Sequence, residues 1–345
     1  MKIVLQGYNT CCQNTFGGIQ KRIRKIYKLL QDKGLNVELF DPFKTVIDSN
    51  TILHVFMLNF ENYQLIKCVK ERGGYVVIST VQSLDGGCKI DFCVKLLNKF
   101  PILTSYKMYY EMLCYADCLI TETKQEKEFI EKHYGITKSK IYVVSNGVEV
   151  NNRPGEEIFD KIGGKKEYIL VVGRFDENKN QLNVIRAFLD TDINVVFIGG
   201  ADFNCRDYYE KCKKIAGDEK NFFFLGWIEA NSPIIASAYA NAKALVIPSF
   251  QETFGFVIVE AAIYGTRIVG SKTIPLLRTE AFDRCHKFNP HSPKDIKRAV
   301  EKSINESLDD SLKKVIEMQY SWEDIINQHI EIYSILEGKR QGDTI

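Results

Sequence analysis

The chain has 345 residues, of which 45% are hydrophobic and 26% charged, with a formal net charge of +2. Its length fits two domains of ordinary size, and its composition is that of a globular protein. The near-zero net charge argues against nucleic acid as the main partner. The first ten residues, MKIVLQGYNT, predict a β-strand instead of a signal peptide, and no later segment reaches membrane-spanning length. Ten cysteines without zinc-type spacing favour free thiols in a cytoplasmic protein.

Strand and helix patterns alternate over the first 150 residues. An apolar strand at 2–6 precedes a helix at 19–34 that carries an apolar stripe. Further strands are expected at 36–40, 52–58, 75–80, 117–123 and 141–148, and further helices at 64–71, 109–115 and 125–134. This alternation predicts a parallel sheet with helices on both faces.

The pattern lapses between residues 150 and 166, where prolines and glycines indicate a linker. A second alternation then begins. Its strands are expected at 168–173, 194–200, 222–226, 244–248 and 267–271, and its helices at 181–189, 207–216 and 234–241, with a helical tail after Pro293. We therefore predict an α/β protein with two doubly wound, Rossmann-like domains, residues 1–150 and 151–321, which face each other across a ligand cleft at their strand ends.

The most informative stretch runs from Ala244 to Gly270. A short apolar strand ends at Pro248, a polar loop follows, and an apolar run begins near Phe254 and stops at Gly265. The β-branched residues 257–259 could form a strand, but the length of the run and its alanines favour a buried helix.

Two carboxylates stand eight positions apart in this stretch. Glu260 lies inside the apolar run, and a buried carboxylate needs a hydrogen-bonding partner, either a group of the protein or a ligand. Glu252 precedes the helix, on the order of 10 Å away by helical rise. That separation suits two hydroxyl-bearing groups of one extended ligand. Between them, the N–H groups of Thr253, Phe254 and Gly255 should point out of a helix N-terminus, where anions bind.

A basic pair follows the strand at 168–172. Arg174 and Lys179 lie in the loop just past the strand end. Two fixed cations there would stabilise the charge that develops on a departing diphosphate. An ordinary surface basic pair is the alternative reading.

Together these segments resemble the signature of retaining GT-B glycosyltransferases of family 4. The matching residues are P-S-x-x-E-T-F-G-x4-E-A-x3-G at 248–265 and G-R-x4-K at 173–179. The resemblance covers almost the whole chain and implies a GT-B fold, with a last helix at 322–340 that crosses back to the first domain. It implies that Arg174 and Lys179 hold the diphosphate, that Glu252 binds the donor sugar, and that Glu260 binds the ribose. Thr253, Phe254 and Gly255 would offer backbone N–H groups.

The resemblance also suggests weaker site residues. Trp227 and Ile228 fall where the family binds the nucleotide base, although Trp227 could instead pack in the core. Gly17 and Gly18 resemble the family's first glycine loop, although a plain tight turn would look the same. Gln82 stands where relatives often carry a histidine; it can donate a hydrogen bond but cannot act as a base.

The first helix carries a basic face. Lysines and arginines at 21, 22, 24, 25 and 28 flank its apolar stripe. Such a helix, residues 19–30, can rest on an anionic membrane, or its charges can simply be solvated.

The resemblance implies a metal-independent hexosyltransferase without cofactor. It would move a hexose from a UDP- or GDP-sugar to a glycan or lipid-linked acceptor in cell-surface polysaccharide synthesis, in the cytoplasm or at the inner face of the membrane. The sequence Asp190-Thr191-Asp192 is predicted to be a turn and not a metal site. One alternative is a GT-B subunit of little activity that binds a sugar nucleotide or a partner glycosyltransferase. Another is a phosphorylase or an epimerase on two similar domains.

Overall fold

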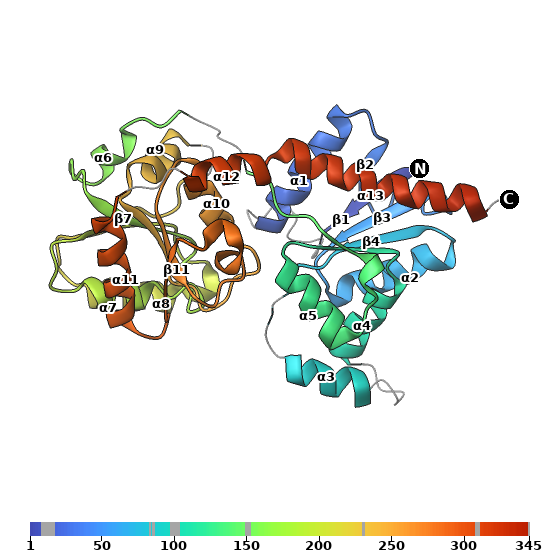
Figure 1. Ribbon diagram of the computed structural model, residues 1–345, viewed down its shortest axis with the longest axis horizontal. Helices are drawn as coiled ribbons and strands as arrows, with labels where there is room; N and C mark the ends of the chain where they lie inside the picture. Colours follow the sequence, from blue (N-terminus) through green and yellow to red (C-terminus); the bar gives the residue numbers. More distant parts are fainter. Residues whose placement is uncertain are drawn as a thin grey trace. The chain divides into compact units, whose positions relative to one another are not determined.

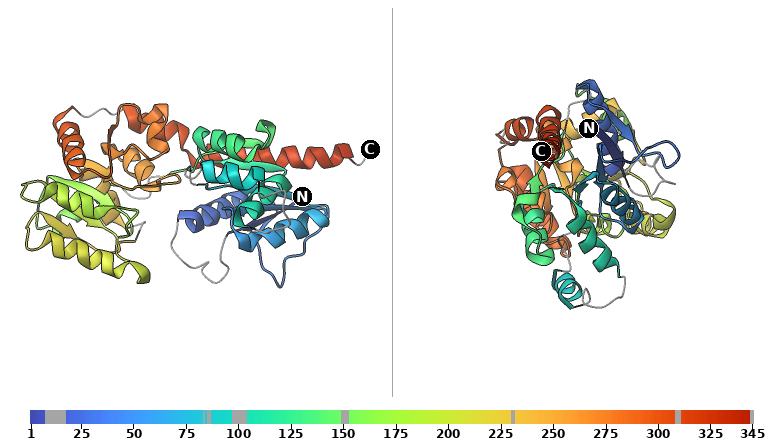
Figure 2. Two further views of the ribbon diagram at one scale, coloured as in Figure 1. Left: turned by 90° about the horizontal axis from the view of Figure 1, so that it is seen from below. Right: turned by 90° about the vertical axis from the view of Figure 1, so that its right-hand side faces the viewer.

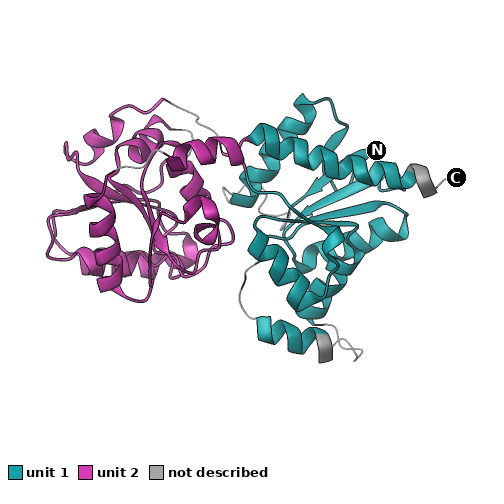
Figure 3. Cartoon of the chain, in the orientation of Figure 1, with its two compact units in different colours: residues 1–146, 322–345 teal, residues 147–321 magenta. Residues whose placement is uncertain are grey.

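The computed structural model describes residues 1–7, 18–82, 84, 87–96, 104–148, 153–229, 232–307 and 311–343. The chain divides into two compact units (Figure 3). Unit 1 comprises Met1–Asn146 and Trp322–Ile345, and unit 2 comprises Gly147–Ser321. The sequence places the boundary after residue 150, four residues beyond this division.

Unit 1 contains a parallel sheet of six strands among its described residues. In spatial order they are β2 (Val37–Leu39), β1 (Lys2–Gln6), β3 (Thr51–Phe56), β4 (Tyr75–Ser79), β5 (Cys118–Thr121) and β6 (Ile141–Val143). The helices are α1 (Gly18–Asp32), α2 (Tyr63–Glu71), α3 (Gly87–Leu96), α4 (Ser105–Tyr115), α5 (Lys124–Tyr134) and α13 (Trp322–Asp343).

The two faces of this sheet bury separate cores. Ile3 and Leu5 of β1 point to one face and pack with α1 and α13, while Val4 points to the other and packs with α2, α4 and α5. The helices on either side of the strands can be followed in Figure 1. α13 thus packs against the rest of unit 1, and its Arg340 also donates to the side chain of Asn50.

Unit 2 repeats the architecture with a different strand order. In space the strands are β12 (His286–Phe288), β11 (Ile268–Ser271), β10 (Ala244–Ile247), β7 (Tyr168–Val172), β8 (Asn194–Ile198) and β9 (Phe222–Phe224), all parallel. The helices are α6 (Glu157–Lys161), α7 (Gln181–Phe188), α8 (Arg206–Ala216), α9 (Pro233–Asn241), α10 (Phe256–Ile263), α11 (Pro293–Asn305) and α12 (Ser311–Gln319). Helices α6, α9, α10 and α12 cover one face and α7, α8 and α11 the other, and Figure 2 shows each unit from two further directions.

The predicted α/β architecture with two doubly wound sheets is confirmed. The apolar run after Phe254 is a helix and not a strand, as its length indicated. Among the described α-helices and strands, three were not predicted: α3, the five-residue helix α6, which lies within the predicted linker, and the three-residue strand β12. β12 mixes polar and apolar residues, and only its pairing with β11 makes it a strand.

Candidate active site of unit 2

The candidate site is built from two loops at the centre of the unit 2 sheet. β7 and β10 are parallel neighbours, and the chain continues from β7 to one side of the sheet and from β10 to the other. Such a switch point leaves a crevice outside the carboxyl ends of the strands. Asn178 joins the two loops there: its Nδ2 donates to the Gln251 carbonyl at 2.9 Å, and its own carbonyl accepts from the Phe250 N–H at 2.8 Å.

Asn180 fixes the start of α7 against the second loop. Its backbone is left-handed, with φ 57° and ψ 30°, a conformation that glycine and asparagine tolerate best. Its buried Nδ2 donates to the carbonyls of Pro248 at 2.9 Å and Pro290 at 2.8 Å. Asn180 therefore supplies the left-handed backbone conformation at this position and adds two hydrogen bonds to the neighbouring loops.

Arg174 is held by two aspartates. Its Nε donates to Asp176 and its Nη1 to Asp202, at 2.8 and 2.9 Å. Asp176 also accepts the backbone N–H of Lys179 at 2.8 Å, so one carboxylate fixes the loop that carries both cations. Within the described residues Nη2 of Arg174 makes no hydrogen bond, and about half of the side chain is exposed. The guanidinium therefore has a free edge for an anion.

Lys179 and Glu252 form an ion pair across the two loops. Nζ of Lys179 lies 2.5 Å from Oε1 of Glu252, which also accepts from the Ser249 hydroxyl at 2.7 Å. Both side chains are more than two-thirds buried. In the part of the chain that the structure describes, Oε2 of Glu252 has no partner, so it can accept a ligand hydroxyl.

The N-terminus of α10 faces the same crevice. Gly255 caps the helix with φ 90°, where L side chains are strained, and a Cβ there would lie 2.8 Å from Cδ1 of Ile258, so the position favours glycine. The N–H groups of Thr253, Phe254 and Gly255 donate to no other described residue. Because the Phe254 ring is buried and packs edge-on against Phe256, only its backbone is available to a ligand.

Glu260 has a side-chain partner that the sequence did not suggest. Its Oε2 accepts from the Tyr239 hydroxyl at 2.9 Å, and the residue is partly exposed instead of fully buried. Burial, followed by the nearby Glu260 carboxylate, raises the pKa of Tyr239 well above its usual value, so the phenol stays a donor. Oε1 of Glu260 makes no hydrogen bond to the described residues and remains available as an acceptor.

Trp227 lies on the surface and not in the core. It is 62% exposed, and its indole covers Gly200, where a Cβ would lie 2.6 Å from Nε1 of the ring. The core-packing alternative for Trp227 is therefore wrong. Ile228, in contrast, is partly buried and packs against the apolar core of unit 2.

The remaining predicted residues belong to unit 1. Gly17 lies outside the described residues, and Gly18 is the exposed first residue of α1. Gln82 follows β4, is partly buried, and donates its backbone N–H to Glu126 at 2.7 Å. His54, which is not among the predicted site residues, is buried in the core, where its ring nitrogens hydrogen-bond the hydroxyls of Tyr333 at 2.7 Å and Ser79 at 2.9 Å.

One residue of the predicted basic face is not on the surface. Arg22 is 1% exposed; its Nη1 donates to Glu122 at 2.8 Å, and its guanidinium lies over the Phe56 ring. The face that α1 presents to solvent is correspondingly less basic than predicted. Within the described residues no helix is both long and apolar enough to cross a bilayer.

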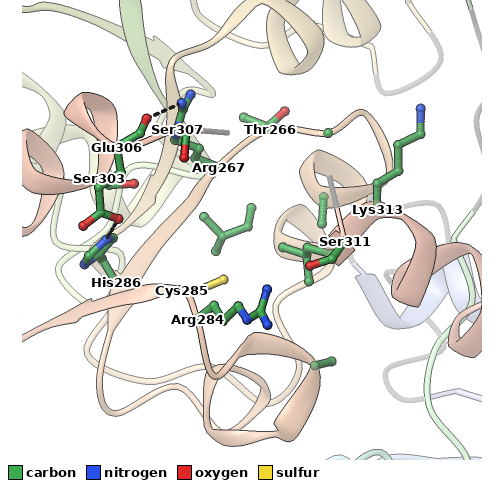
Figure 4. Close-up of a pocket in the computed structure, with 15 residues that line it drawn as sticks. Thr266, Arg267, Arg284, Cys285, His286, Ser303, Glu306, Ser307, Ser311 and Lys313 are labelled. Carbon is green, nitrogen blue, oxygen red and sulfur yellow. Dashed lines mark hydrogen bonds and ion pairs between the residues drawn. The ribbon is translucent and has the colours of Figure 1, made fainter. Parts of the chain in front are cut away.

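A separate cavity of about 110 Å³ lies at the amino ends of strands β11 and β12 in unit 2 (Figure 4). It is lined by residues that precede β11 and β12 and by the ends of α10 and α11. His286 and Arg267, which line it, both bond Glu306. Because the crevice beside Lys179 lies at the carboxyl ends of the strands, the cavity is not part of it.

The residues that hydrogen-bond to the predicted binding groups were not predicted from the sequence. Asp176, Asp202, Tyr239 and Ser249 orient the predicted binding groups, but they come from four separate segments. Local signals existed for two of them: Asp176 lies two residues after Arg174, and Ser249 lies three residues before Glu252.

Residues 155–322 match the family model of glycosyl transferases group 1. An uncharacterized glycosyltransferase of Methanocaldococcus jannaschii is 27% identical over 245 residues, covering 64% of this chain and 61% of that protein. The processive diacylglycerol alpha-glucosyltransferase of Acholeplasma laidlawii is 26% identical, covering 69% of this chain and 70% of that protein. The chain thus spans less than two thirds of the first of these relatives.

Solved structures with similar folds cover nearly the whole chain. Sucrose-phosphate synthase from Thermosynechococcus elongatus superposes with a TM-score of 0.77 at 16% identity, covering 98% of this chain and 100% of that one. Anabaena HepE in complex with UDP superposes with a TM-score of 0.70 at 16% identity, covering 97% and 100%. The fold is GT-B. The solved structures show the fold, and the family match over residues 155–322 supports a glycosyl transferase, whereas the retaining mechanism and the assignment to family 4 stay predictions.

Proposed function

We propose that the protein is a retaining hexosyltransferase that moves a sugar from a UDP- or GDP-sugar to a glycan or lipid-linked acceptor. One observation carries the proposal. At the switch point of unit 2, two held side chains each keep one open polar atom, Nη2 of Arg174 and Oε2 of Glu252, and Glu260 of the helix that follows keeps Oε1 open. Beside them lies a helix N-terminus whose first N–H groups are unpaired among the described residues.

These open atoms suit the parts of a nucleotide sugar. The diphosphate meets Nη2 of Arg174 and the ammonium of Lys179, an arginine fork and a point charge. The N–H groups of residues 253–255 supply further donors for its anionic end. Glu252 accepts a sugar hydroxyl, and Glu260 accepts a ribose hydroxyl. Trp227 offers an exposed aromatic face to the base.

The chemistry then needs no nucleophilic side chain and no metal. The bond between the sugar carbon and the diphosphate oxygen breaks while the acceptor oxygen bonds to the same face of that carbon. The departing phosphate takes the acceptor's proton. Arg174 and Lys179 stabilise the charge on that phosphate, and their fixed partners keep them in position before the reaction begins.

The printed names of relatives support the donor and acceptor classes. The Acholeplasma relative is a diacylglycerol glucosyltransferase, and a Campylobacter jejuni relative, 31% identical over 106 residues, acts on a diphospho-undecaprenol carrier. HepE was solved with UDP-glucose. Synthesis of a cell-surface glycan, in the cytoplasm or at the inner membrane face, is the role we propose. Contact of helix 19–30 with the membrane remains a prediction.

Release of nucleoside diphosphate tests the proposal. A thermal-shift screen with UDP- and GDP-sugars first identifies the donor, since a ligand of the folded state raises the melting temperature. With that donor, Arg174→Ala and Glu260→Gln should each lower turnover by about 10²–10³-fold. Arg186→Ala is the matched control, because Arg186 is an exposed arginine of unit 2 bonded to Asn183. Unchanged turnover in both site variants would show that the site is assigned wrongly.

A non-catalytic subunit remains the second candidate, and Gln82 is the observation that favours it. A wild-type protein that binds a UDP- or GDP-sugar in the thermal-shift screen but releases no nucleoside diphosphate would support this candidate.

A further inference from the structure

Glu126 is a buried carboxylate of unit 1 that the proposed chemistry does not use. It lies in the first turn of α5 and is 4% exposed. Its Oε1 accepts from the Thr80 hydroxyl at 2.6 Å and from the Gln82 N–H at 2.7 Å. Its Oε2 accepts from the Glu122 N–H at 2.7 Å.

These contacts exceed what helix capping requires. Thr123 caps α5, and its hydroxyl accepts the Glu126 N–H at 3.2 Å. In a capping box the acidic side chain reaches back to the N-cap backbone. Glu126 instead lies at the carboxyl ends of β4 and β5, where its hydrogen bonds connect the segment that follows β4 to the segment that follows β5.

The turn that Glu126 holds is strained. Val81 has φ 45°, in the left-handed region that β-branched residues rarely occupy. Its neighbours Thr80 and Gln82 are the two residues that donate to Oε1 of Glu126. Strain of this kind costs about 1–3 kcal/mol and persists only where surrounding contacts enforce it, which is typical of functional sites.

The charges around Glu126 make its position costly. Burial, and then the neighbouring Glu122, raise the pKa of Glu126 to about 7. Glu122 accepts from Nη1 of Arg22 and from Nδ2 of Asn146, each at 2.8 Å. Glu122 and Arg22 are thus the charged groups that face Glu126, from the end of β5 and from α1.

We propose that Glu126 is a positioning residue: it holds the Val81–Gln82 turn so that Gln82 can hydrogen-bond a substrate of the transfer reaction. This inference rests on the proposed function. It explains why a carboxylate is buried at this sheet edge and why a valine keeps a left-handed backbone there. Gln82 would touch substrate, and Glu126 would act only through it.

Three variants of the full chain test this role. Glu126→Gln keeps the size of the side chain but replaces one of its two acceptor oxygens with an NH2 donor, which must then face at least one of the three groups that donate to Glu126. Glu126→Asp keeps the charge. The matched control is Asp117→Asn. Asp117 holds the other end of β4, where it accepts the Val76 N–H at 2.8 Å, so its variant should lose stability without disturbing the turn.

The readouts are turnover of the donor that wild type uses, UDP binding by calorimetry, and the pH profile. Glu126→Gln should lower kcat at least about tenfold with an unchanged Kd for UDP. Wild-type activity should fall as the pH drops below about 7, where Glu126 takes up a proton, and Glu126→Gln should lack this fall. Glu126→Asp should recover part of the activity, and Asp117→Asn should keep a wild-type kcat.

Two results would overturn the inference while leaving the proposed function intact. One is wild-type kcat and pH profile in folded Glu126→Gln. The other is an equal fall of kcat in Asp117→Asn, which would point to lost stability alone. A wild-type protein that turns over no donor would overturn both proposals together.

Discussion

At the scale of single residues, the site depends on backbone conformations that only certain side chains permit. Gly255 at the head of α10 and Asn180 at the head of α7 both have positive φ, and both lie in the two loops of the switch point. The motif residues Arg174, Lys179 and Glu252 could be predicted from the sequence because their spacing is local. Asp202, which binds Arg174, and Tyr239, which binds Glu260, could not, because a hydrogen bond between separate segments leaves no spacing in the sequence.

Gly255→Ala tests this backbone requirement. An added Cβ would meet Ile258 at 2.8 Å on a backbone with φ 90°, so we expect a stability loss of about 1–3 kcal/mol. It should also weaken UDP binding, because the N–H groups of the helix N-terminus would move. Urea unfolding and calorimetry measure the two effects.

Gly265→Ala is the control at the other end of the same helix. Its φ is 82°, but the nearest atom to an added Cβ is 4.0 Å away. This variant should lose stability and keep UDP binding. Equal weakening of binding in both variants would argue against a role for the α10 N-terminus.

At the scale of elements, apolar periodicity predicted most strands and helices but not the environment of each helix face. Arg22 was grouped with the solvated cations of the first helix, yet it is buried against Glu122. A pattern records spacing and residue type, and a buried ion pair between α1 and the end of β5 depends on packing that it does not contain. The same limit applies to β12, which owes its strand conformation to β11.

The packing of α13 on the unit 1 sheet predicts that the stability of the protein depends on pH through His329. His329 of α13 is fully buried, and its Nδ1 donates to the Ile325 carbonyl at 2.8 Å. Burial, and then the charge of Arg22, lower the pKa of His329 from 6.5 to about 4. The unfolded chain therefore binds a proton near pH 6.5 and the folded chain only near pH 4. The contribution of His329 to the free energy of unfolding is therefore fully present above pH 6.5 and is lost as the pH falls towards 4.

Because of His329, we expect the free energy of unfolding of wild type to fall by about 2 kcal/mol when the pH is lowered from 7.5 to 5. His329→Gln should lack this loss. Glu126, whose raised pKa acts in the opposite direction, is present in both proteins and cancels in the comparison. Denaturant titrations of both proteins at the two pH values give the difference, and an equal decline in both would contradict the assignment.

At the scale of the molecule, chain order and structural units do not coincide. Unit 1 is completed by residues from both ends of the chain, and unit 2 lies between them in sequence. The connecting segments meet where Val148 donates its N–H to the Tyr320 carbonyl at 2.7 Å. Each unit has its own pair of cores, so loss of α13 should affect the two units unequally.

Ending the chain at Ser321 tests that asymmetry. α13 contributes five buried apolar side chains to unit 1: Ile325, Ile326, Ile332, Tyr333 and Leu336. At roughly 1.5–3 kcal/mol each, their burial is comparable to the whole stability of a domain. Unit 1 should therefore fail to fold, whereas unit 2 keeps both of its cores and should still bind UDP. A chain ended after Glu337 retains all five side chains and should behave as wild type. Differential scanning calorimetry with and without UDP measures both outcomes. If the chain ended at Ser321 unfolds in a single cooperative transition with the enthalpy of wild type, the prediction is wrong.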